Sequence, residues 1–200
     1  NCGFALCSFA SYGASAWIPT FMQRTYGWNI QQIGLAYGLV IMIFGSAGIV
    51  VGGRLSDRMM RKGISEAPLR VGLWGALGTL PFGALYPLMP TGLGSVLMMA
   101  PTVFFLAMPF GVAPAAIADI VPPAMRGQAS AVYLFIVNLI GLGLGPTAVA
   151  LFTDQVLHDP QAIRWSLMWV GGAALAGAVA LLSLGLAPYR ASWSRLHATS

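Results

Sequence analysis

Long apolar stretches alternate with short polar segments along the whole chain. Each stretch is a continuous run rather than a strict alternation, which predicts α-helices and excludes a membrane β-barrel. A helix that crosses the hydrocarbon core of a bilayer needs about 20 residues. Six stretches come near this length, at residues 4–21, 33–52, 69–89, 95–121, 129–152 and 166–188. The pattern therefore predicts an all-α membrane protein, with a six-helix bundle over 1–190 and a cytoplasmic tail over 191–200.

The composition agrees with a membrane location. Hydrophobic residues make up 58% of the 200 residues and charged residues only 8%, whereas an ordinary soluble domain carries about 25% charged residues. Five acidic and ten basic residues cannot coat a soluble domain of this size. A soluble enzyme, a nucleic-acid-binding protein and a disordered chain are excluded, and the expected surroundings are a lipid bilayer.

The basic residues are distributed unevenly between the connecting segments. Eight of the ten lie in the second connection, the fourth connection and the tail, whereas the other connections hold only Arg24 and Arg164. By the positive-inside rule, the segments rich in Lys and Arg face the cytoplasm. We therefore expect a multi-pass protein of the bacterial inner membrane, with the second connection and the C-terminus in the cytoplasm.

Nothing in the sequence points to catalysis. Cys2 and Cys7 are too few and too close for a disulfide framework, and no Cys/His spacing predicts a metal site. The serines of the apolar stretches have no His or acidic partner within those stretches. We expect no catalytic residue, metal or cofactor, and no enzyme activity. Because the chain begins with Asn1, we also expect it to be a fragment of a longer protein.

The second connection carries the most specific motif. It reads Gly53-Arg54-Leu55-Ser56-Asp57-Arg58-Met59-Met60-Arg61-Lys62. This run resembles the signature between paired helices of the major facilitator superfamily, with matches at Gly53, Leu55, Asp57, Arg58, Arg61 and Lys62. The resemblance implies a cytoplasmic gate, in which Asp57 pairs with a neighbouring helix N-terminus and Gly53 allows two helices to approach closely. The alternative is an ordinary basic loop, which requires neither an Asp nor fixed spacing.

Three further segments resemble the same family. Asp119 and Arg126 fit its pattern of an acid followed by Arg-Gly, which implies a charge cluster with the basic connection; the alternative is a solvated pair. Residues 138–146 resemble its glycine-rich penultimate helix, and Trp17-Ile18-Pro19-Thr20-Phe21 with Ile33-Gly34-Leu35 resembles its seventh and eighth helices. Bacterial members of the Spinster-like and organic-anion symporter branches have similar sequences in the last of these segments, and the sequence does not separate these two branches.

The resemblance implies what the whole protein does. The family fold has twelve helices in two bundles, and this chain resembles helices seven to twelve. The implied partner is the N-terminal six-helix half of the same protein. The implied function is movement of a small organic solute by alternating access, as a symporter or antiporter with a coupling proton or sodium. The alternative is a non-transporting membrane receptor or assembly protein on the same scaffold.

The resemblance also implies which residues line a substrate cavity. Carried onto this chain, the candidates are Asn138, Tyr12, Tyr37, Phe104, Phe105 and Tyr133. Asn138 is the strongest candidate, because on a regular helix it shares a face with Gly141 and Gly145 and an amide is costly in lipid. The alternatives are an interhelical hydrogen bond for Asn138 and simple packing for the aromatic residues.

Glycines form a stripe in the second apolar stretch. At 100° per residue they fall within an arc of about 80°, which predicts close contact with one neighbouring helix. These glycines are Gly34, Gly38, Gly45, Gly48 and Gly52.

Overall fold

The structure is a computed structural model that describes residues 1–197 of the chain. The α-helices are α1 (Cys2–Tyr26), α2 (Ile30–Val40), α3 (Ser46–Arg61), α4 (Ala67–Leu85), α5 (Gly92–Ala118), α6 (Arg126–Asn138), α7 (Gly145–Leu151) and α8 (Ile163–His197). Short π-helical segments join or extend some of them: η1 (Ile41–Gly45), η4 (Leu139–Leu144) and η5 (Phe152–Leu157). The 3₁₀ turns are η2 (Tyr86–Leu88), η3 (Pro123–Met125) and η6 (Pro160–Ala162).

The all-α fold class is confirmed, and the helices combine into long rods. Within the described residues, five rods are long and apolar enough to cross a membrane: Ile30–Arg61, Ala67–Leu88, Gly92–Ile117, Pro123–Leu157 and Ile163–Ser194. Helix α1 is also long, at 25 residues, but it falls outside this group because serines, tyrosine and tryptophan interrupt its apolar sequence. It corresponds to the first of the six predicted spans.

Local signals in the sequence explain where the rods begin and end. Helix α1 ends at Gly27, whose φ of 69° is left-handed and suits glycine. Helix α2 begins with a capping box, in which the Asn29 side chain accepts a hydrogen bond from the Gln32 amide at 2.8 Å. After α3 the chain turns at Gly63, with a φ of 82°. Thr91 caps α5 by accepting a hydrogen bond from the Gly94 amide at 3.2 Å.

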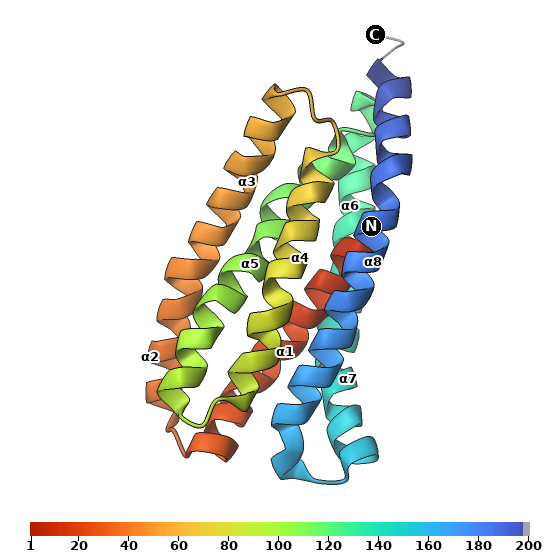
Figure 1. The fold of residues 1–200 in the computed structure, drawn as a ribbon. Helices are drawn as coiled ribbons and strands as arrows, with labels where there is room; N and C mark the ends of the chain where they lie inside the picture. Colours follow the sequence, from red (N-terminus) through yellow and green to blue (C-terminus); the bar gives the residue numbers. More distant parts are fainter. Residues whose placement is uncertain (198–200) are drawn as a thin grey trace.

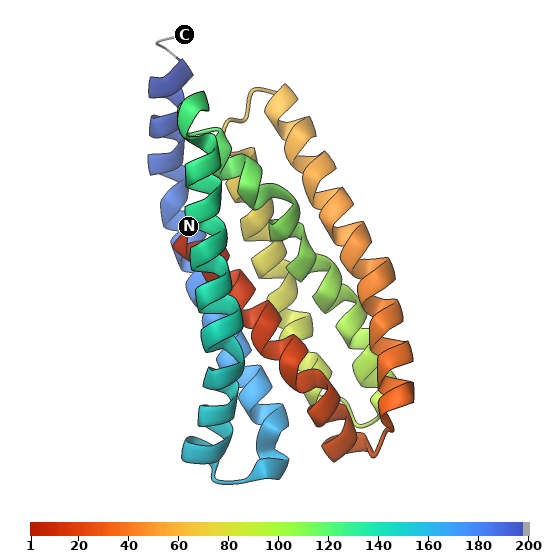
Figure 2. The same ribbon diagram turned by 180° about the vertical axis from the view of Figure 1, so that it is seen from behind.

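The rods pack side by side into one bundle (Figure 1). Helix α4 packs against α5 and α8, and α5 packs against α3. Seen from behind, α1 runs obliquely between the α2–α3 rod and the α6–α7 rod (Figure 2). One end of the bundle gathers the end of α3, the start of α4, the start of α6 and the end of α8 (Figure 1). We call it the basic end, because it carries Arg54, Arg58, Arg61, Lys62, Arg70, Arg126 and Arg190.

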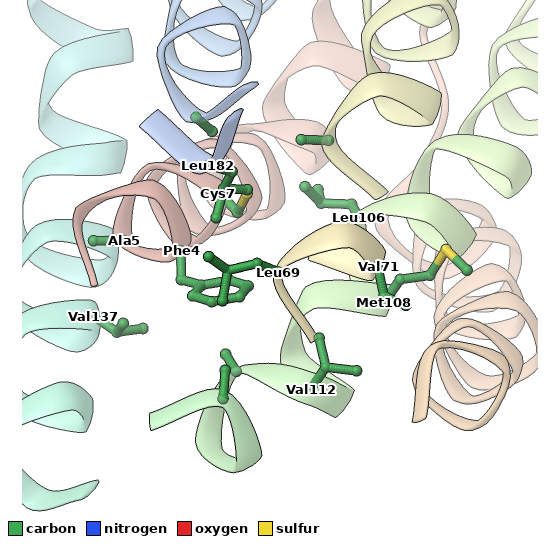
Figure 3. Close-up of a cluster of buried hydrophobic side chains, with 14 of the residues drawn as sticks. Phe4, Ala5, Cys7, Leu69, Val71, Leu106, Met108, Val112, Val137 and Leu182 are labelled. Atoms are coloured by element: carbon green, nitrogen blue, oxygen red, sulfur yellow. The ribbon is translucent and has the colours of Figure 1, made fainter. Parts of the chain in front are cut away.

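A hydrophobic core fills the centre of the bundle towards the basic end. Phe4 and Cys7 of α1 lie next to Leu182 of α8, as Figure 3 shows, and Val71 of α4 and Val112 of α5 belong to the same cluster. Figure 3 also labels Ala5, Leu69, Leu106, Met108 and Val137 of this cluster. Burial of one such side chain contributes about 1.5–3 kcal/mol relative to exposure in water; in lipid, close packing takes over that role.

Glycines allow two pairs of rods to touch backbone to backbone. An added Cβ at Gly52 would lie 2.8 Å from the Met108 carbonyl oxygen of α5. An added Cβ at Gly145 of α7 would lie 2.9 Å from the Gly13 amide nitrogen of α1. Both distances are too short for a real side chain, so these positions require glycine.

The π segment η1 divides the predicted glycine stripe. Gly45, Gly48 and Gly52 contact α5, whereas nothing lies within 4 Å of a Cβ placed on Gly34 or Gly38. A π-helix holds an extra residue in its turn, which rotates the part of the rod before it by roughly 100°. The prediction of one continuous stripe is therefore wrong for its first two members.

The chain beyond residue 190 continues as helix. Helix α8 includes Pro188 and extends to His197, so residues 191–197 of the predicted tail prolong the last rod. Residues 198–200 of that tail lie outside the described part of the chain.

Candidate functional site: a cavity and a basic end

A cavity lies between α1, the α2–α3 rod and α5. Its volume is about 290 Å³. The lining consists of apolar side chains interrupted by hydroxyl groups, and none of these residues carries a charge. They are Ser11, Ala14, Ser15, Ile18, Tyr37, Ile41, Gly45, Ser46, Ile49, Tyr86, Met99, Thr102, Val103, Leu106, Ala107 and Phe110.

The hydroxyl groups of the lining fall into two kinds. Ser15 Oγ donates to the Tyr12 carbonyl at 3.2 Å and Thr102 Oγ1 donates to the Met98 carbonyl at 2.7 Å, so both are satisfied within their own helices. The hydroxyls of Ser11, Ser46, Tyr37 and Tyr86 form no hydrogen bond with the residues that the structure describes. These four groups are available to a bound molecule.

Of the six predicted cavity residues, Tyr37 lines the cavity and Tyr12 lies beside it. The Tyr12 ring meets the lining residue Phe110 edge to face, with ring centroids 6.5 Å apart. Phe105 instead belongs to the packing between α4 and α5, where it stacks on Phe82 with ring centroids 6.1 Å apart. Phe104 meets Phe105 of its own helix, with ring centroids 5.3 Å apart. Tyr133 is buried in the core cluster. All three side chains pack within the bundle, and a contact between them and a solute stays a prediction.

Asn138 does not reach the cavity. Its side chain is exposed, and its Nδ2 donates to the Leu134 carbonyl of the same helix at 2.7 Å. The predicted shared face with Gly141 and Gly145 fails because η4 begins directly after Asn138 and changes the helical phase. Both glycines face α1, where Cβ atoms would clash with the Tyr12 ring at 2.6 Å and the Phe9 carbonyl at 2.7 Å.

The gate motif lies on a helix, which corrects the prediction of a loop. Residues 53–61 form the last turns of α3, and the connection proper is only 62–66. Asp57, Arg58, Arg61 and Lys62 are exposed there, while Leu55 packs against the core cluster. Nothing lies within 4 Å of a Cβ placed on Gly53. The close approach expected of Gly53 is made by its neighbour Gly52.

The structure does not join Asp119 and Arg126 into one cluster with this motif. Asp119 follows α5 and lies near the phenol of Tyr189 on α8. Arg126 is exposed at the start of α6, and it takes part in no ion pair with the residues described. An ion pair between Asp119 and Arg126 is not present among the described residues, and the charge cluster stays a prediction.

A different charge cluster occupies the basic end. Glu66 is buried between α4 and α8, where Arg70 Nη2 donates to its Oε1 at 2.8 Å and Arg190 Nη2 donates to the same oxygen. Ser65 Oγ donates to Oε2 at 3.1 Å. Mainly because of the Arg190 hydrogen bond, the pKa of Glu66 falls from 4.5 to about 2. Sequence analysis missed this cluster: the four-residue spacing of Glu66 and Arg70 signals one pair, but nothing in the sequence indicates Arg190.

The comparisons with known proteins agree with this architecture. A family model described as Major Facilitator Superfamily matches residues 2–199. An "MFS-type efflux pump" of Mycolicibacterium smegmatis is 31% identical over 184 residues, which cover 88% of this chain and 42% of that protein. The chain thus spans less than half the length of this relative.

Two solved structures share the fold. Both are of a bacterial homolog to the human lysosomal transporter Spinster, one inward-facing and unoccupied, the other inward-facing and occupied. The unoccupied structure has a TM-score of 0.65 at 19% identity, covering 96% of this chain and 46% of that one. The occupied structure has a TM-score of 0.66 at 19% identity, covering 95% and 47%. With a family match along almost its whole length and a relative above 30% identity, the chain belongs to the major facilitator superfamily.

Proposed function

We propose that the protein moves a small, uncharged organic solute across a bacterial inner membrane by alternating access. The observation that carries this proposal is the cavity of about 290 Å³ among the rods, lined by apolar and hydroxyl side chains. Removing a charged group from water without a partner is costly, so this lining favours a neutral solute. The hydroxyls of Ser11, Ser46 and Tyr37 would orient it.

The direction and the coupling follow from other observations. The relative named as an efflux pump favours export. Because the cavity lining carries no carboxylate, we expect a coupling proton or sodium to bind elsewhere in the protein. A second six-helix bundle of the same protein is the expected moving partner, since the chain spans 46% of a solved structure of the same fold.

The gate motif is proposed to hold the cytoplasmic side closed. Asp57, Arg58, Arg61 and Lys62 are exposed at the basic end, and none of them forms an ion pair within the described bundle. Exposed charges of both signs on one helix end are well placed to pair with the second bundle in one state of the cycle. With that end closed, the cavity would open outward.

The test is dye efflux from bacteria that express the full-length product of the gene. Nile red serves as a neutral probe and ethidium as a permanently charged one. We expect expressing cells to retain less Nile red than cells with an empty vector, and equal amounts of ethidium. Equal retention of Nile red, with the protein present in the membrane, would reject the proposal; reduced retention of ethidium alone would reject the neutral substrate class.

A further inference from the structure

Helices α2 and α3, the two parts of one rod, differ in how closely they pack against the rest of the bundle. Helix α3 touches the backbone of α5 at Gly48 and Gly52, and it also buries Ser56 and Met59. Helix α2 buries only Ile33 and Val40 among its 11 residues. Helices with few buried contacts move at lower cost than those packed along a whole face. Helix α2 is therefore the weakly held part of this rod.

The joint between the two parts is the π segment η1 at Ile41–Gly45. π segments are rare in helices and often occur at functional positions. Two of its residues, Ile41 and Gly45, line the cavity, and so does Tyr37 from the last turn of α2. A change of angle at this joint would displace Tyr37 relative to α5.

We propose that α2 is a movable wall of the cavity, hinged at Ile41–Gly45. When α2 swings away from α5, Tyr37 withdraws and the cavity opens; when it returns, Tyr37 closes on the solute. This inference rests on the proposed transport function. It adds a motion within one bundle to the motion of the bundle as a whole.

The directions in which residues before and after η1 point provide a test of the hinge. On a regular helix Val40 and Gly45 would point about 140° apart, although both are buried. The extra residue of the π turn brings them to the same side. Removing one exposed residue from the turn leaves them four positions apart, about 40° on a regular helix. Deletion of Ile43 should therefore remove the joint and keep both parts packed.

Deletion of Val50 is the matched control. Val50 is also exposed and apolar, but it lies in the regular helix α3. Its loss would turn Gly52, Ser56 and Met59 by about 100° away from their contacts. We expect the full-length protein without Ile43 to stay monodisperse in detergent with a melting temperature close to that of the wild type. We expect the protein without Val50 to aggregate.

The functional readouts compare wild type with the Ile43 deletion. We expect Nile red efflux to fall by about tenfold or more, because changes at a hinge often alter the rate of a cycle that depends on the motion. We also expect amide hydrogen exchange in wild-type α2 to be faster than in α3, and to slow in α2 when Ile43 is removed. The exchange measurement does not depend on transport, so it still tests the hinge if wild type moves no Nile red and the proposed function fails.

Three results would overturn the hinge. The first is wild-type efflux by the variant without Ile43. The second is loss of folding by this variant to the same extent as without Val50. The third is equal exchange in α2 and α3 of the wild type.

Discussion

The carboxylate of Glu66 accepts a hydrogen bond from Arg190, a residue 124 positions later in the chain. This contact ties the start of α4 to the end of α8 at the basic end, and Arg70 joins it from the next turn of α4. Because Glu66 is buried, the cluster is shielded from solvent on the carboxylate side. Because three donors satisfy this buried carboxylate, we expect the cluster to contribute more than an exposed ion pair does.

Glu66→Gln should lower the stability of the protein by about 1.5–3 kcal/mol, the range for a hydrogen bond to a charged group. The pKa of Glu66 is lowered from 4.5 to about 2 on folding. Its contribution is therefore complete above pH 4.5 and is lost as the pH falls towards 2. The melting temperatures of the wild type and of Glu66→Gln should differ at pH 7 and converge towards pH 2. A constant difference across this range would contradict the assignment. Ser192→Ala, an exposed change on α8 two residues from Arg190, serves as control.

Gly52→Val should destabilise the bundle, because a Cβ there would lie 2.8 Å from the Met108 carbonyl oxygen. Overpacking of this kind costs about 1–3 kcal/mol. The adjacent Gly53→Val is the control, since no atom lies within 4 Å of its Cβ position. Thermal unfolding in detergent should separate the two variants clearly. If both lost equal stability, the contact between α3 and α5 would not be the cause.

Asp57→Asn should reduce dye efflux by about tenfold, while membrane insertion stays normal. This value lies within the roughly 5–150-fold range by which one site of a protein typically affects another. The amide keeps the shape of the side chain but loses the charge that the proposed latch requires. Asp154→Asn is the matched control, because Asp154 is also exposed but lies in η5 near the opposite end of the bundle. Wild-type efflux by Asp57→Asn, measured at equal amounts in the membrane, would argue against a latch.

Tyr37→Phe should weaken transport of hydroxyl-binding solutes by several-fold, since it removes one unbonded hydroxyl from the cavity lining. Asn138→Leu should leave transport unchanged, because its amide is exposed and bonded only to its own helix. The two variants are compared by the concentration of solute that gives half-maximal transport. A larger effect of Asn138→Leu would restore this residue as a substrate contact and remove Tyr37 from that role.

The sequence predicted the rods well because continuous apolar runs leave few alternatives in a membrane. It predicted poorly which face of each rod a given residue occupies. Asn138, Gly34 and Gly38 were all placed on faces that a regular helix would give them, and π segments beside them changed those faces. An extra residue in one turn leaves no distinct trace in composition or hydropathy.

The charge cluster was missed for a different reason. Glu66 and Arg70 are neighbours along a helix, so their pairing follows from spacing alone. Arg190 reaches them only because α8 packs against α4, and no property of the residue itself indicates this contact. The gate motif was recognised by its residues, yet its assignment to a loop failed because basic residues were taken as a sign of solvated chain.

The contact between Gly13 and Gly145 has a mechanical consequence for the cavity. Here the backbones of α1 and α7 meet with no side chains between them, and the Trp17 indole adds a bond to the Pro146 carbonyl at 2.9 Å. No layer of side chains lies between the two backbones at this point to absorb a relative movement. We therefore expect α1 and α7 to move together, so that a solute that displaces Ser11 would also shift the rod on the far side of α1.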